Sequence, residues 1–155
     1  MAADDARARA LPVTAEGEDR PVPDLDSVGE IHDLVVRFYR EIVFDDILAP
    51  VFDEVAEVNW AVHIPRLIRY WCRVLIGTPG YDGYILAAHR HVHGLEPFEL
   101  EYFDRWYTLF VETVDAGWSG PLADTAKSHA ARMAAMLARQ LLDAEWHAPV
   151  AVTKR

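Results

Sequence analysis

The sequence predicts an all-α fold with five or six helices. Apolar residues recur at intervals of three and four through most of the chain, which is the spacing of an amphipathic helix. No segment shows convincing apolar-polar alternation with a period of two, which a half-buried strand would require. At 155 residues the chain is the size of one domain. We expect that domain to span residues 25–147, between a disordered N-terminal tail (1–24) and a C-terminal tail (148–155).

Two helical segments are expected before residue 55. Ser27 and Glu30 have the spacing of a capping box, and the apolar stripe behind them predicts a helix to about residue 42. Tyr39 lies beside this stripe and presents a phenol at the margin of the core. Residues 45–52 predict a short capped turn of helix, which Pro50 and the acidic residues after it bring to an end.

The stretch from Trp60 to Trp106 contains the candidate site. A helix over residues 60–75 places His63 on the same face as its apolar side chains. Because Pro65 lies just beyond His63, we expect this helix either to start near residue 64 or to kink there. After a Gly/Pro turn, residues 85–93 place His89 and His93 at i, i+4, on one helical face.

Two longer helices complete the expected fold. Pro97 opens a helix whose apolar spacing turns Trp106 toward the core, and Gly117 ends it. The last helix runs from about residue 121 to 142 and is rich in alanine. Its expected buried positions are Ala130, Met133, Ala134, Met136, Leu137 and Leu141.

Composition and charge argue against several classes of partner. The net charge of −10 and the pI near 5.0 oppose electrostatic binding to nucleic acid or to an anionic membrane surface. Cys72 is the only cysteine, so the chain forms no internal disulfide and no cysteine-rich zinc site. We find no apolar run of membrane-spanning length and no secretory signal, and we expect a cytoplasmic protein.

Core-facing histidines on separate helices suggest a metal or heme site. A histidine alone on an apolar face is more often a hydrogen-bonded core residue, but His63 is accompanied by His89 and His93. The chain has no Glu-x-x-His pair of the kind that di-iron bundles use, which favours heme. A second interpretation stays open, in which His89 and His93 bind a divalent metal in a non-heme helical module.

An ordered set of motifs over residues 28–142 resembles the group III truncated hemoglobins. The set comprises Phe38-Tyr39, Leu48-x-Pro50-x-Phe52, Trp60-x-x-His63, Trp71-x-x-Val-Leu75-x-Gly77, Tyr81-x-Gly83, His89-x-x-Val92 and Phe103-x-Arg105-Trp106-x-x-Leu109-Phe110. This family implies a two-over-two helical sandwich around heme. Each motif is weak alone, and their order makes the resemblance specific.

The resemblance implies roles for individual residues on the ligand-binding, or distal, side of the heme. Tyr39, His63 and Trp106 would be the distal tyrosine, histidine and tryptophan. Leu67 would lie beside the bound gas and Phe52 would pack on the heme. We also expect Arg66 to reach a heme propionate and Trp71 to contact the cofactor.

The residue that binds the iron, the proximal ligand, is left with two candidates. Spacing from Tyr81-x-Gly83 in the family pattern selects His89, whereas spacing back from Trp106 selects His93. We prefer His89 and place an insertion near residues 94–96.

The function implied by the resemblance is binding of dioxygen and other diatomic gases (NO, CO) at heme b. The heme would be held without thioether links, since the chain has no Cys-x-x-Cys-His motif. The enzymatic alternative is a nitric oxide dioxygenase or peroxidase-like activity, which needs an external reductant such as a reductase.

Overall fold

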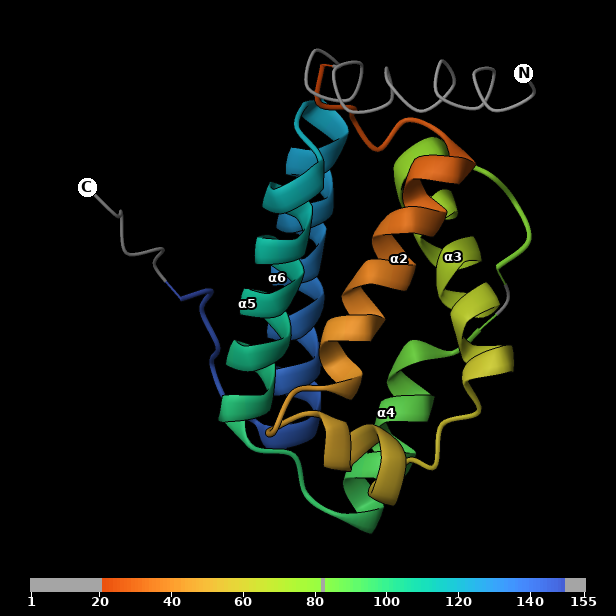
Figure 1. Cartoon of the computed structure of the whole chain (residues 1–155). Coiled ribbons are helices and arrows are strands. Elements are labelled where there is room, and N and C mark those ends of the chain that lie inside the picture. The colour runs from red at the N-terminus through yellow and green to blue at the C-terminus, as the bar shows by residue number, and fades with distance from the viewer. Residues whose placement is uncertain (1–20, 82, 150–155) are drawn as a thin grey trace, which may run out of the picture.

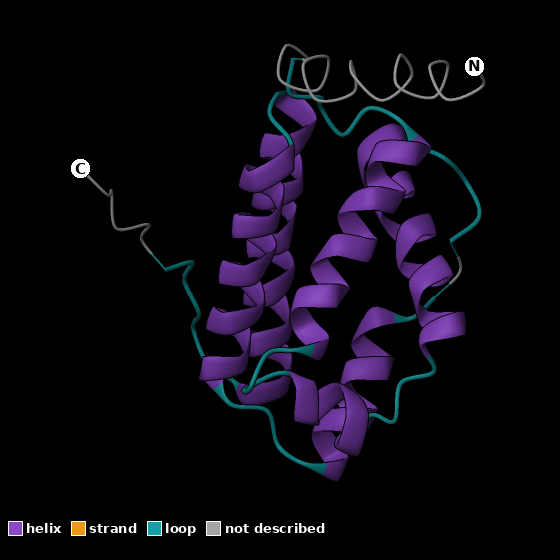
Figure 2. Cartoon of the chain, in the orientation of Figure 1, coloured by secondary structure: helices purple, strands orange, loops and turns teal. Residues whose placement is uncertain are grey.

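The computed structural model describes residues 21–81 and 83–149 (Figure 1). The two expected tails lie outside the described residues except for 21–24 and 148–149. The described residues form helices and loops without a strand (Figure 2), which confirms the predicted all-α class. In chain order the helices are α2 (Val28–Val43), the π-helix η1 (Val51–Val55), α3 (Trp60–Ile76), α4 (Ile85–Leu95), α5 (Leu100–Gly117) and α6 (Pro121–Leu142).

The four long helices form two packed pairs. Helix α2 packs against α3, and α5 runs beside α6 (Figure 1). The pairs contact each other through α2 with α5 and through α3 with α6, while the shorter α4 contacts α6. This is the two-over-two sandwich that we expected.

Aromatic side chains fill the centre of the sandwich. Phe38 of α2 and Phe110 of α5 are each 1% exposed, and their rings meet edge to face at 5.2 Å between centroids. Trp71 of α3 stacks on Phe110 with 5.0 Å between centroids. Residues from three helices therefore share one core.

Helix α2 begins as the sequence predicts, but its capping box is incomplete. The Glu30 backbone N–H donates to the Ser27 hydroxyl at 3.2 Å. The Glu30 carboxylate accepts a hydrogen bond of 2.9 Å from the Trp118 indole N–H, and no return hydrogen bond from the Ser27 N–H to it occurs in the described part of the chain. Trp118 is 3% exposed, and a buried indole N–H needs an acceptor.

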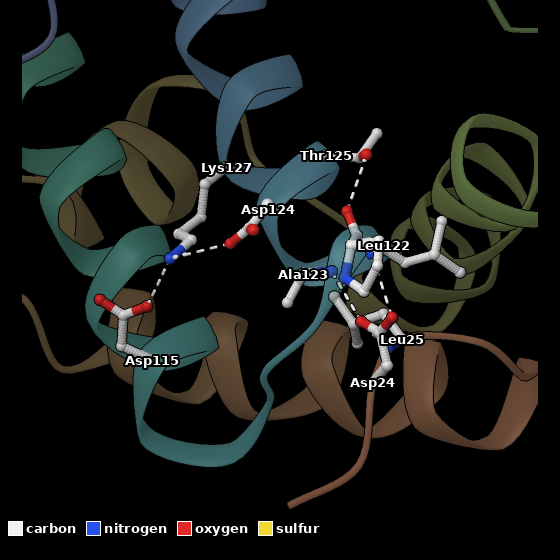
Figure 3. Close-up of polar contacts among 9 residues, drawn as sticks. Asp24, Leu25, Asp115, Leu122, Ala123, Asp124, Thr125 and Lys127 are labelled. Atoms are coloured by element: carbon white, nitrogen blue, oxygen red, sulfur yellow. Dashed lines mark hydrogen bonds and ion pairs between the residues drawn. The ribbon is translucent and has the colours of Figure 1, made fainter.

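A carboxylate that precedes α2 in the chain caps the start of α6 (Figure 3). The Asp24 side chain accepts hydrogen bonds from the backbone N–H groups of Leu25, Leu122 and Ala123 at 2.8–3.1 Å. Two of these N–H groups belong to the first turn of α6, where no intrahelical partner exists. One turn later, Lys127 forms an ion pair of 2.8 Å with Asp115 of α5. These contacts fix both ends of the α5–α6 connection.

The segment after α2 departs from the prediction at Pro50. Asp45 caps this segment as expected, accepting from the N–H groups of Ile47 and Leu48 at 3.2 and 2.9 Å. Pro50 does not end the segment but immediately precedes η1. Proline is tolerated at the start of a helix because an N–H there would lack an intrahelical partner.

Of the two alternatives that Pro65 leaves for α3, a start near residue 64 is wrong, because the helix begins at Trp60 as its apolar spacing predicts. Asn59 caps the helix, accepting from Ala61 N–H at 3.2 Å, and the helix then passes through Pro65 to Ile76. It ends at Gly77, whose φ of 68° lies in the left-handed region that glycine adopts without strain.

Smaller differences affect the later helices. Helix α4 continues through Gly94 to Leu95, and α5 begins at Leu100 rather than at Pro97. Met136 is 39% exposed, although we expected it to be buried. It lies on the outer edge of the helical stripe, whereas the small side chains of α6 provide most of the buried face.

Candidate functional site

A cavity of about 240 Å³ opens between the two helical pairs and α4. Its walls are mainly apolar and aromatic, as in most sites for small organic ligands and cofactors. Every residue that we expected at the site lines it except the alternative ligand His93. These lining residues are Tyr39, Phe52, His63, Arg66, Leu67, Trp71, His89 and Trp106.

Four rings from three elements pack together beside the cavity, and three of them, those of Tyr39, Phe52 and His63, line it. Tyr39 of α2 lies 5.6–6.0 Å, between ring centroids, from Phe52 of η1 and from Trp60 and His63 of α3. Phe52 stacks on Trp60 at 5.7 Å. The one-turn spacing of Trp60 and His63 on α3 brings both rings against Tyr39. We call these four residues the distal cluster.

Trp106 of α5 hydrogen-bonds to Tyr39 within the core. The indole N–H donates to the Tyr39 hydroxyl oxygen. Burial raises the pKa of Tyr39 despite this hydrogen bond, so the phenol keeps its proton. The Trp106 ring stacks on Phe110 at 5.6 Å between centroids, which holds the indole in place. The arrangement leaves the Tyr39 O–H as a donor.

His63 is neutral at physiological pH. Burial lowers its pKa to about 4, with smaller contributions from the positive charges of Arg66 and of His89 when protonated. The two imidazoles, His63 on α3 and His89 on α4, line the same cavity. Neutral His63 can donate from one ring nitrogen and accept at the other.

His89 is oriented by a backbone carbonyl of its own helix. Its Nδ1 lies 2.7 Å from the carbonyl oxygen of Ile85. A carbonyl only accepts, so Nδ1 carries the proton and the neutral ring has a lone pair at Nε2. Burial lowers the pKa of His89, although the hydrogen bond to Ile85 opposes this.

His93 forms the opposite kind of hydrogen bond. Its Nδ1 accepts from the backbone N–H of Phe98 at 2.9 Å, so the neutral ring carries its proton on Nε2. The ring packs on Phe98 at 5.5 Å between centroids. His93 therefore connects the last turns of α4 to the loop that precedes α5.

The remaining expected residues differ in exposure. Trp71 is 3% exposed and belongs to the central core as well as to the cavity wall. Leu67 is half-buried, and Arg66 is exposed at the rim. The guanidinium of Arg66 can therefore meet a charged group without leaving solvent.

We did not predict the positions of two polar residues at this site, Tyr70 of α3 and His129 of α6. Tyr70 lines the cavity, and its hydroxyl lies 2.5 Å from Nε2 of His129, a histidine to which the sequence assigned no role. The helical spacing of Tyr70 from Leu67 could have placed Tyr70 at the site. Nothing in the sequence signals the contact with His129, which lies 59 residues away along the chain.

Two features are absent from the described residues, a membrane-spanning helix and a cluster of metal-ligating side chains. None of the helices there is long and apolar enough to cross a membrane. No group of three or more His, Cys, Asp or Glu side chains in this part of the chain is placed to hold a metal ion.

Comparisons with known proteins point to one family. The chain is 29% identical over 85 residues to the group 3 truncated hemoglobin ctb of Campylobacter jejuni, a match that covers 53% of this chain and 65% of that protein. The fold is similar to the crystal structure of a group III truncated hemoglobin from Campylobacter jejuni, with a TM-score of 0.67 and 24% identity over 74% of this chain and 91% of that one. No family model matches the sequence.

Proposed function

We propose, for a chain that has the truncated-globin fold and resembles the group III truncated hemoglobins in sequence, that the cavity binds one heme b and that His89 is its iron ligand. Bound heme would supply a ferrous iron that binds dioxygen and other diatomic gases. The protein's own contribution is to hold the cofactor, exclude water and donate hydrogen bonds.

The hydrogen bond from His89 Nδ1 to the Ile85 carbonyl is the observation that carries this proposal. Histidines that bind metals typically donate from the second ring nitrogen to a carbonyl or carboxylate, which fixes both the tautomer and the ring orientation. His89 has this arrangement at the wall of the cavity. His93 does not line the cavity, and its Nδ1 is occupied as an acceptor. The contrast favours His89 over His93.

The cavity walls suit a flat, largely apolar ring with a charged edge. Phe52, Leu67 and Trp71 supply apolar contact area from two different elements. Arg66, exposed at the rim, would pair with a propionate while both groups remain solvated. Burial of the porphyrin against these side chains would provide most of the affinity.

Tyr39 would be the main hydrogen-bond donor to a bound gas. Its oxygen accepts from Trp106, so its own proton is available for a polar ligand. A donor to the Tyr39 oxygen strengthens Tyr39 as a donor in turn. Neutral His63 would serve as a second donor or as an acceptor. Such a site favours dioxygen, which becomes polarised when bound, over carbon monoxide.

Titration of the purified chain with hemin tests the proposal directly. We expect an intense Soret band that saturates at one heme per chain, and heme that acid and organic solvent extract because no thioether links exist. A protein of similar size that has no heme site provides the control for non-specific uptake. A chain that shows no saturable Soret band contradicts the proposal.

The enzymatic alternative is supported by the neutral His63 beside the Tyr39 phenol, because these groups can exchange protons with a reacting ligand. A nitric oxide dioxygenase or peroxidase would in addition need electrons from a reductase, for which neither the site nor the comparisons give a candidate. Multiple turnover with nitric oxide or peroxide in the presence of a reductase would distinguish this function from gas binding. The non-heme interpretation lacks support in the described residues, where His89 and His93 belong to no three-residue ligand group.

A further inference from the structure

Tyr70 and His129 form a pair that the proposed gas-binding function does not use. The Tyr70 hydroxyl lies 2.5 Å from His129 Nε2 and 3.6 Å from the Met133 sulfur. Tyr70 and Met133 both line the cavity. His129 of α6 is partly exposed and packs on Trp71 with 5.5 Å between ring centroids. The pair therefore extends from the cavity wall toward solvent.

The phenol is the donor in this pair. Burial, and to a lesser extent the positive charge of Arg132, lower the pKa of His129, so its imidazole is neutral and can accept at Nε2. A phenol is a much stronger acid than a neutral imidazole N–H, and a thioether is a weak acceptor. The hydrogen bond consequently runs from the Tyr70 O–H to Nε2.

We propose that Tyr70 is a one-electron donor to oxidants formed in the cavity and that His129 accepts its phenolic proton. This inference rests on the proposed heme. The oxidant class is a hydroperoxide, whose O–O bond breaks as it takes two electrons and two protons to give an alcohol and water. Bound heme would supply those electrons and solvent would supply the protons. Tyr70 would return one electron to the heme, and an external thiol or ascorbate would return the other.

The proton transfer accounts for the choice of Tyr70. Loss of an electron makes a phenol a very strong acid, so the electron leaves readily only if a base takes the proton. At Tyr70 the O–H bond breaks and an N–H bond forms at His129, which leaves a neutral phenoxyl radical and an imidazolium. The partial exposure of His129 lets that proton pass to water. An external thiol or ascorbate would later reduce the radical.

Tyr39 provides an internal comparison. It also lines the cavity, but it is 7% exposed and its hydroxyl accepts from Trp106. No hydrogen bond from Tyr39 to a base occurs among the described residues. Oxidation of Tyr39 would leave its proton without an acceptor. Of the five tyrosines that line the cavity, these two are therefore suited to different tasks, Tyr39 to ligand binding and Tyr70 to electron transfer.

Electron paramagnetic resonance of the heme-loaded, ferric full chain tests the proposal. Hydrogen peroxide is added and the samples are frozen within seconds. We expect a tyrosyl signal in the wild type and in Tyr107→Phe, a control whose ring packs on Trp146 away from the cavity. Tyr70→Phe should lose most of the signal. His129→Gln, which can accept a hydrogen bond but not a proton, should lower the radical yield and reduce the solvent deuterium isotope effect on radical formation.

A second measurement needs no variant at the site. A nitroso spin trap added to the wild type with peroxide should label Tyr70 within the tryptic peptide of residues 70–73, and fragmentation would separate it from Trp71 and Cys72. A Soret band with the label wholly on other residues overturns the redox role and leaves heme binding intact. The same holds if Tyr70→Phe retains the full signal. Absence of the Soret band overturns the heme proposal itself.

Discussion

Replacement of Tyr39 by phenylalanine should selectively weaken dioxygen binding. The change removes one hydroxyl from a ring that is 7% exposed and is surrounded by Phe52, Trp60 and His63. The ring itself is retained, so the packing of the distal cluster should persist. What is lost is the proposed hydrogen bond to bound dioxygen, together with the acceptor for the Trp106 N–H.

The magnitude follows from the burial of that hydrogen bond. A buried hydrogen bond to a polarised group contributes roughly 1–3 kcal/mol, and about 1.4 kcal/mol corresponds to a factor of ten. We therefore expect the dioxygen off-rate to rise by roughly five- to a hundredfold in Tyr39→Phe. Trp106→Phe should also raise the rate, but by a smaller factor, because the indole acts through the oxygen of Tyr39.

Stopped-flow displacement of dioxygen by carbon monoxide, with flash photolysis for the carbon monoxide rates, would measure both gases on the same samples. Bound carbon monoxide is far less polar, so its dissociation should change little. Similar factors for the two gases in both variants would refute the reasoning, because a widened pocket affects both ligands whereas a lost hydrogen bond affects mainly dioxygen.

Three further predictions concern stability. Asp45→Asn should lower the free energy of unfolding by about 1–3 kcal/mol, measured in urea against the exposed control Asp46→Asn, because Asp45 is 6% exposed and holds an ion pair and two backbone N–H groups. Asp24→Ala should cost about 1–2 kcal/mol relative to Asp26→Ala. Burial raises the pKa of Asp24, but hydrogen bonds from three backbone N–H groups lower it by more, so the folded-state pKa lies below the ordinary value of 3.8. The stabilisation by Asp24 is therefore present above pH 3.8 and is lost as the pH falls through the folded-state pKa. Burial is the main cause that lowers the pKa of His63 to about 4 in the folded chain, whereas its pKa in the unfolded chain is about 6.5. Between these values the unfolded chain binds a proton that the folded chain does not. The free energy of unfolding should therefore decline as the pH falls from about 7 toward 4. His63→Gln should make that decline shallower, and an unchanged slope would contradict the assignment.

The helical periodicity of the sequence predicts most of the fold. The three- and four-residue spacing of apolar side chains identifies the long helices, and it placed His63 and Trp106 on inward faces because a helix repeats every 3.6 residues. The predictions were wrong where the type of side chain and the helical period suggest different structures. Met136 is apolar, yet alanines occupy the buried face of α6. Pro50 resembles a helix breaker but stands at a helix start.

Contacts in the folded structure identify the favoured iron ligand and the Tyr70–His129 pair, which periodicity does not predict. His89 and His93 share a helical face, so spacing alone left both as iron ligands. Only the partners of their Nδ1 atoms, the Ile85 carbonyl and the Phe98 N–H, distinguish the two tautomers. The contact of Tyr70 with His129 joins two helices 59 residues apart, and no local pattern encodes such a pairing.

The ferrous absorption spectrum of His89→Gly tests the central claim most directly. We predict that this variant lacks the five-coordinate ferrous spectrum of the wild type and that added imidazole restores it, because free imidazole can occupy the space of the missing ring. His93→Gly should keep the wild-type spectrum without imidazole, although loss of its hydrogen bond to Phe98 should lower its stability. A wild-type spectrum in His89→Gly, with imidazole-dependent recovery in His93→Gly, would contradict the assignment of His89 as the iron ligand.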